Sequence, residues 1–181
     1  MNIMMLDVNP RQCARYYPDR LVAAVLRDTA CVLSAAHVQL DGLPTAKARV
    51  GLLLPPYYLP VYTAHAITGS PWARWAALQR ANYGWLHQLM HCLTQEFYQR
   101  WHRAHAFELV AEHLVRAPLN VPAGAQAFTL APQCMPAQYK RASTVEAYRL
   151  YFAGEKRALA QWTPPARVPA WYAQLTQEHA A

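Results

Sequence analysis

The sequence of 181 residues has few of the residues that build nucleotide-binding loops or disulfide-bonded folds. It contains only six glycines, and neither GxGxxG nor GxxxxGK[ST] occurs in it, so dinucleotide or nucleoside triphosphate binding by those loops is not indicated. The four cysteines are widely scattered, with no CxxC pair. This spacing predicts reduced thiols rather than a zinc site or a disulfide framework.

Long apolar runs are also missing. No stretch of about eighteen uncharged apolar residues occurs, and the longest candidate, residues 50–59, is interrupted by Pro55 and Pro56. The first residues lack the basic region and the apolar run of a signal peptide. With a hydrophobic fraction of 54 % and a mean hydropathy of −0.08, the sequence predicts one domain over residues 1–181, cytoplasmic and outside the membrane.

Acidic residues are scarce relative to basic ones. Ten acids stand against seventeen lysines and arginines, which gives a net charge of +7, and fourteen of the basic residues are arginine. The guanidinium fork matches phosphate oxygens, so this balance favours nucleic acid or another phosphorylated partner. One alternative is that the arginines pair with the acids or cover aromatic rings. Another is that the basic face binds a protein partner.

Four of the six tryptophans lie in residues 70–105, which we expect to form the central helical segment. Ser70 followed by Pro71 is typical of a helix start, and Asn82 offers a second cap that restarts or kinks the helix. Apolar residues then recur at helical spacing at positions 86, 89, 90, 93, 97 and 101. A second stripe carries His87, His91, His102 and His105, and it is either the wall of a polar cleft or a solvated face.

The fold class predicted is mainly α, a single compact helical domain. Residues 1–8 predict a short buried strand. Further helices are expected after Pro10, over 19–37, over 106–116, over 143–162 and near the C-terminus; the hydroxyl of Ser143 and the carboxylate of Glu146 have capping-box spacing. Residues 45–68 and 118–132 are rich in proline, which predicts long loops.

Carboxylates next to basic residues are the candidates for chemistry. Asp19 precedes Arg20, and Glu155 precedes Lys156. Enzymes that excise or modify bases use such carboxylates to activate a nucleophile or to stabilise a cationic sugar, although surface ion pairs give the same pattern. No triad motif occurs, and His87 with His91 lacks the glutamate of HExxH and a third ligand. No metal and no cofactor are therefore predicted.

Motifs along nearly the whole chain resemble a family of small proteins common in tailed-phage genomes. The residues that carry the resemblance are Met1-Asn-Ile with Leu6-Asp7 and Pro10, Asp19-Arg20, Asn82-Tyr83-Gly-Trp85, Pro132-Gln-Cys-Met-Pro136 with Tyr139-Lys140, and Val145-Glu-Ala-Tyr-Arg149 with Tyr151, Glu155-Lys156 and Trp162. The resemblance implies a phage protein linked to DNA base modification or glycosylase-like chemistry.

The leading hypothesis is a DNA-binding protein that acts on or recognises a nucleobase. It assigns catalysis to Asp19 and Glu155, and it assigns phosphate contacts to Arg20, Lys140, Arg149 and Lys156 and base stacking to Tyr83, Trp85 and Tyr139.

This chain departs from the family pattern at two places. The family has His-Cys-Asp-Lys-His where this chain has Tyr17 to Leu21, and Asn-His-Pro where this chain has Gly69-Ser70-Pro71. The chain is therefore a divergent enzyme or a binding protein that has lost catalysis. Two further hypotheses are a non-catalytic module that binds a protein partner and an enzyme that acts on free nucleotides.

Overall fold

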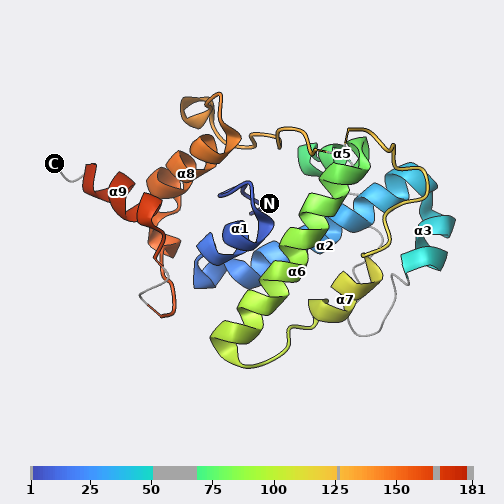
Figure 1. The fold of residues 1–181 in the computed structure, drawn as a ribbon, viewed down its shortest axis with the longest axis horizontal. Helices are drawn as coiled ribbons and strands as arrows, with labels where there is room; N and C mark the ends of the chain where they lie inside the picture. Colours follow the sequence, from blue (N-terminus) through green and yellow to red (C-terminus); the bar gives the residue numbers. More distant parts are fainter. Residues whose placement is uncertain (1, 51–68, 126, 165–167, 179–181) are drawn as a thin grey trace.

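The structure, a computed structural model, describes residues 2–50, 69–125, 127–164 and 168–178. Over these ranges it contains α-helices, two short 3-10 helices and no strand, which confirms the mainly helical prediction. The elements in chain order are α1 (Pro10–Tyr16), α2 (Asp19–Asp41), α3 (Leu43–Val50), α5 (Pro71–Leu78), α6 (Arg80–Trp101), α7 (Phe107–His113), η1 (Ala137–Tyr139), α8 (Thr144–Glu155), η2 (Arg157–Leu159) and α9 (Ala170–Glu178) (Figure 1).

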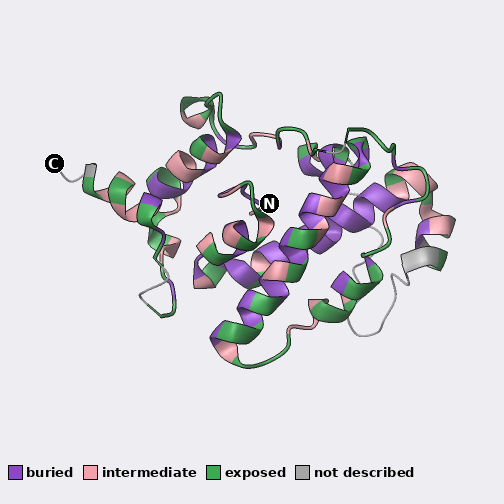
Figure 2. Cartoon of the chain, in the orientation of Figure 1, coloured by how far each residue is buried: buried purple, intermediate pink, exposed green. Residues whose placement is uncertain are grey.

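Helix α6 lies at the centre of the molecule, and it packs against α1, α2, α5 and α7. Its apolar residues at the predicted helical spacing are buried; Leu86, Leu89, Met90 and Leu93 have no exposed surface. Figure 2 shows the same burial along the inner side of α6 and over most of α2. The regular apolar spacing therefore marks the core, as the sequence predicts.

The tryptophan-rich segment consists of two helices, and their junction differs from the prediction. Ser70 caps α5 as expected, because its Oγ accepts a hydrogen bond of 3.2 Å from the backbone N–H of Ala73. The break occurs at Gln79, whose φ of −162° is extended. Asn82 is buried inside α6, where its side chain donates to the carbonyl of Trp75 at 2.9 Å. Asn82 therefore joins the two helices rather than starting the second.

Helix α2 is long and apolar enough to span a membrane by length and composition, and 72 % of its most apolar stretch is buried within the protein. The core helix of a globular protein has the same properties, so α2 is weak evidence for a membrane span. It packs against α5 and α6.

The predicted N-terminal strand is absent from the described residues, and that prediction was wrong. Residues 3–6 are fully buried, but no neighbouring strand pairs with them. Side chains form hydrogen bonds with the backbone of this segment instead. The Tyr17 hydroxyl accepts from the Met4 N–H and donates to the Met4 carbonyl, each at 2.6 Å. Arg149 Nε donates to the Leu6 carbonyl at 2.9 Å, and Trp85 Nε1 donates to the Val8 carbonyl at 2.7 Å. An apolar run predicts burial but does not specify what bonds the backbone.

Two other boundaries differ from the predictions. Residues 43–50, partly assigned to a loop, form α3, because Pro44 sits in the first turn, where a proline is tolerated, and helix-favouring residues follow it. The remainder of the predicted 45–68 loop lies outside the described residues. Helix α8 begins after Ser143 as predicted but ends at Glu155 rather than Trp162, and η2 turns the chain so that Trp162 packs on Phe152.

Candidate functional site

Three of the predicted site residues, Tyr139, Glu155 and Lys156, lie together where η1 packs against α8, and a fourth, Lys140, follows Tyr139 at the end of η1. The Tyr139 hydroxyl donates a hydrogen bond of 2.9 Å to Glu155 Oε1. The ring of Tyr139 meets that of Tyr151 edge to face, with centroids 5.5 Å apart, and Lys156 Nζ lies 5.7 Å from the Tyr151 centroid. We call this region, with Arg141 included, the η1–α8 surface.

Gly154 makes room for Tyr139 on α8. A Cβ atom at this position would lie 2.6 Å from the Tyr139 hydroxyl oxygen and 3.0 Å from its Cε1. A larger residue would require the end of the Tyr139 ring to move away from the helix. Gly154 therefore fixes the position of the aromatic pair, a role that the sequence analysis missed.

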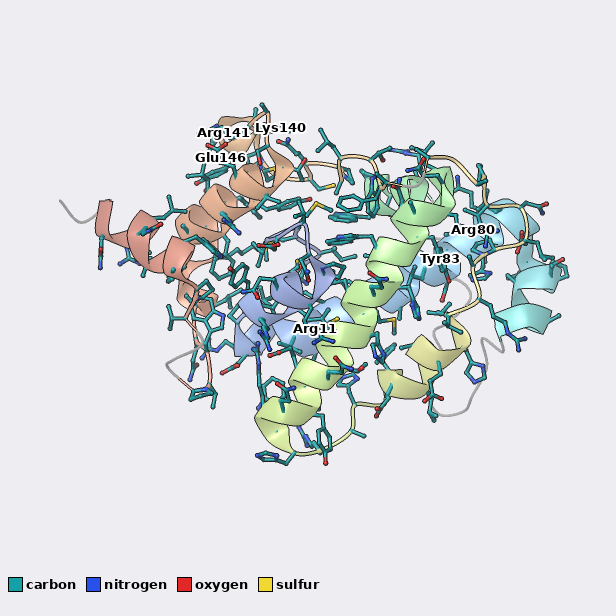
Figure 3. All side chains as sticks on the ribbon, in the orientation of Figure 1. Arg11, Arg80, Tyr83, Lys140, Arg141 and Glu146 are labelled. Atoms are coloured by element: carbon teal, nitrogen blue, oxygen red, sulfur yellow. The ribbon has the colours of Figure 1, made fainter. Side chains whose placement is uncertain are left out.

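The chain between η1 and α8 is held by Gln133, which the sequence analysis also missed. Its side chain accepts a hydrogen bond of 3.1 Å from the Arg141 N–H and donates one of 2.7 Å to the Arg141 carbonyl. Arg141 Nη1 in turn donates to the carbonyls of Gln138 and Lys140 at 2.9 and 2.8 Å. Lys140 and Arg141 are exposed and lie together beside the start of α8 (Figure 3). They are thus presented on an ordered loop.

Exposed charge is mostly positive across the described side chains. Eleven lysines and arginines are exposed, against four exposed glutamates at 108, 112, 146 and 155. Asp7, Asp19, Asp28 and Glu96 each pair with an arginine within 4.0 Å, and Asp41 accepts hydrogen bonds from the backbone N–H groups of Leu119 and Asn120. These five of the nine acids whose side chains the structure describes therefore have partners within the protein, and exposed cations outnumber exposed acids.

The electrostatics at Tyr139 keep its hydroxyl protonated. The hydrogen bond to the Glu155 carboxylate raises the pKa of Tyr139, and partial desolvation adds to this shift. A phenol that donates to a carboxylate loses that bond on ionisation, which disfavours the phenolate. Tyr139 thus acts as a donor and as an aromatic face at neutral pH.

Asp19, the other proposed catalytic acid, lies at the start of α2 and has a structural environment. Its Oδ1 accepts from Arg100 Nη1 at 2.9 Å, and its Oδ2 accepts from the Thr163 hydroxyl at 2.9 Å. Arg20 beside it is exposed. No contact among the described residues joins Asp19 to Glu155, so the structure does not bring the two acids together as a catalytic pair.

Arg149 is bonded to the protein itself rather than presented to a ligand. Its Nη2 lies 3.2 Å from Asp7 Oδ2, and its Nε donates to the Leu6 carbonyl. The guanidinium carbon lies 5.5 and 5.4 Å from the ring centroids of Tyr16 and Trp171. Arg149 therefore anchors the N-terminal segment to α8, and its predicted phosphate contact is replaced by these bonds.

Two of the three residues predicted to stack on bases, Tyr83 and Trp85, are in the core. Tyr83 is 2 % exposed and Trp85 is 4 % exposed. The Tyr83 hydroxyl donates to the Leu114 carbonyl at 2.7 Å and lies 3.0 Å from His37 Nε2. A base cannot reach either ring in this structure, whereas the ring of Tyr139 is partly exposed.

The histidine stripe serves local structure. His87 Nε2 bonds the Ala111 carbonyl at 2.9 Å and so ties α6 to α7, and burial lowers its pKa. His102 ends α6 in the left-handed conformation with φ of 51°. Within the described part of the chain, no three potential metal ligands cluster.

Comparisons with known proteins show no family to which the chain belongs. No protein-family model matches the chain, and no curated protein and no solved structure is significantly similar to it.

Proposed function

We propose that this protein binds nucleic acid through the η1–α8 surface. The observation that carries the proposal is that Lys156 lies beside an aromatic pair, Tyr139 and Tyr151, and that two exposed cations, Lys140 and Arg141, follow Tyr139 directly in the chain. These residues come from two separate stretches of the chain.

Nucleic-acid binding without sequence preference needs two kinds of group. Cationic side chains neutralise phosphates and release counterions, and aromatic rings stack on bases. The η1–α8 surface supplies both on an ordered support. The exposed excess of cations over acids on the described surface adds attraction at longer range.

DNA is the form of nucleic acid that the resemblance to tailed-phage proteins favours, and recognition is favoured over base chemistry. Asp19 has both carboxylate oxygens occupied by Arg100 and Thr163, and Glu155 accepts from Tyr139. The proposed role is therefore binding, with Glu155 as a positioning residue for Tyr139.

An electrophoretic shift assay tests the proposal with the full chain. Single-stranded and double-stranded oligonucleotides are titrated at about 50 and 200 mM salt, the range over which phosphate-dominated binding weakens steeply. The proposal predicts a shift at low salt that weakens at the higher salt. If neither oligonucleotide shifts at low salt, nucleic-acid binding is ruled out and a protein partner for the basic face becomes the better hypothesis.

A further inference from the structure

A polar trough, separate from the residues of the η1–α8 surface, lies over α6. One hollow of about 430 Å³ extends over α6 between α1 and α7, and a second of about 360 Å³ adjoins it at the start of α9. Arg15 and Gln99 line both hollows, so the two adjoin each other. We call this feature the α1–α6 trough; its main polar lining is Arg11, Arg15, Gln95, Glu96 and Gln99.

Two arginines of α1 form one wall of the trough. Arg11 and Arg15 are both exposed and are four residues apart, so their side chains lie on the same side of the helix. Figure 3 shows Arg11 extending from α1 towards α6, where burial raises the pKa of the Cys92 thiol and the nearby Arg11 guanidinium opposes that shift. Like charges one turn apart repel each other, and an anion between them would relieve that repulsion.

Glu96, the acid on the floor of the trough, is already paired with the buried Arg100. Glu96 Oε2 accepts from Nε and Nη2 of the buried Arg100 at 3.3 and 3.0 Å. Arg15 Nε lies 3.8 Å from Glu96 Oε1, and the Arg15 side chain is 55 % exposed. Arg15 is thus held loosely, and more than half of its side-chain surface is exposed.

We propose that the α1–α6 trough binds the terminal phosphate of a phosphorylated ligand, clamped between Arg11 and Arg15. A dianionic phosphate has enough oxygens to accept from both guanidinium forks. The ligand is a free nucleotide or the phosphorylated end of a strand, since both carry this group. The proposal does not depend on the η1–α8 surface.

Glu108 of α7 lines the same hollow and opposes the anion. It is exposed and has no ion pair among the described residues. Glu108→Gln removes a negative charge without changing the shape of the side chain. It should therefore strengthen binding, which is the opposite effect to that of the arginine variants.

Isothermal titration calorimetry with the full chain tests the proposal. The probes are pyrophosphate, AMP and one oligonucleotide with either a 5′-phosphate or a 5′-hydroxyl. Binding should weaken about tenfold or more in R11A/R15A, because charge-assisted hydrogen bonds are lost, and tighten in E108Q. R80A/R116A loses the same charge elsewhere and should bind as the wild type does. If folding of the alanine variant is impaired, R11K/R15K replaces it. This variant keeps the charge without the fork and should show an intermediate affinity.

Protection of Cys92 from alkylation gives a second readout. Cys13 and Cys31 are buried, so in a C134S background Cys92 is the one remaining accessible thiol. A ligand in the trough should slow its alkylation. Binding of AMP assigns the site to free nucleotides, and binding only of the 5′-phosphorylated strand assigns it to strand ends. The proposal is overturned if no phosphorylated probe binds the wild type, or if R11A/R15A binds and protects Cys92 as the wild type does.

Discussion

Arg100 Nη1 lies 2.9 Å from Asp19 Oδ1, and the arginine side chain is completely buried. The remaining donors of this guanidinium bond Glu96 and the carbonyls of Arg15 and Tyr17. All five N–H groups therefore have partners. The pair joins the start of α2 to the end of α6, so the carboxylate that the sequence suggested for catalysis is part of the framework.

Removal of either partner of this pair should destabilise the fold. Arg100→Ala leaves Asp19 without its counter-ion and leaves the buried Glu96 with only the exposed Arg15, 3.8 Å away, so a loss of about 3–5 kcal/mol in the free energy of unfolding is expected. Urea denaturation followed by tryptophan fluorescence measures it. Glu155→Gln changes an exposed carboxylate and is the control, with a change within about 0.5 kcal/mol. Equal stability of Arg100→Ala and the wild type would contradict the structural role of Asp19.

The Tyr17 hydroxyl should contribute to stability through the N-terminal segment. Tyr17→Phe leaves the buried N–H of Met4 without its partner and removes one of the donors to the Met4 carbonyl, which should cost about 1–3 kcal/mol. Tyr98 is 58 % exposed, and Tyr98→Phe serves as the matched control with little change. The two variants are compared by chemical denaturation. A loss no larger than that of the control would show that water or another group replaces the hydroxyl.

Two glycines in helices should respond oppositely to alanine. At Gly84 nothing lies within 4 Å of the added Cβ, so Gly84→Ala should stabilise the protein by about 0.5–1 kcal/mol through helix propensity. At Gly154 the Cβ would collide with Tyr139, so Gly154→Ala should weaken nucleic-acid binding without this gain in stability. Thermal denaturation and the shift assay measure the two effects. If Gly154→Ala binds nucleic acid as the wild type does, Tyr139 is not part of the binding surface.

Stability should fall in mild acid because of His87. Its pKa is lowered from the usual 6.5 by burial, so the unfolded chain binds a proton at a higher pH than the folded protein does. The contribution of His87 is full above pH 6.5 and is lost as the pH falls through the lowered folded value. His87→Gln should flatten this dependence in denaturation series between about pH 7 and 5. His113→Gln, at an exposed position, should leave it unchanged, and identical curves for His87→Gln and the wild type would refute the assignment.

Periodicity and capping residues predicted the helical class and most helix starts. The Ser70 and Ser143 caps are present, because a hydroxyl ahead of a helix acts locally. The strand at residues 1–8 was wrong, since burial there depends on Tyr17, Trp85 and Arg149, which are far away in the sequence.

The candidate site could be predicted only in part for the same reason. Tyr139, Lys140, Glu155 and Lys156 were identified from two motifs near each other in the chain, and they are joined by short-range packing of η1 on α8. The assignment of Asp19 and Arg149 depended on residue type alone. Nothing local shows that their partners are Arg100 and Asp7, which lie 81 and 142 positions away.

The salt dependence of DNA affinity tests the central proposal most directly. Fluorescence anisotropy with a single-stranded oligonucleotide gives the slope of log Kobs against log salt for the wild type, K140A/R141A and R80A/R116A, which loses the same charge away from the surface. Loss of two phosphate contacts should reduce the slope by about 1.4 in K140A/R141A, and the slope of R80A/R116A should match that of the wild type. An unchanged slope in K140A/R141A, or an equal reduction in both variants, would contradict binding at the η1–α8 surface.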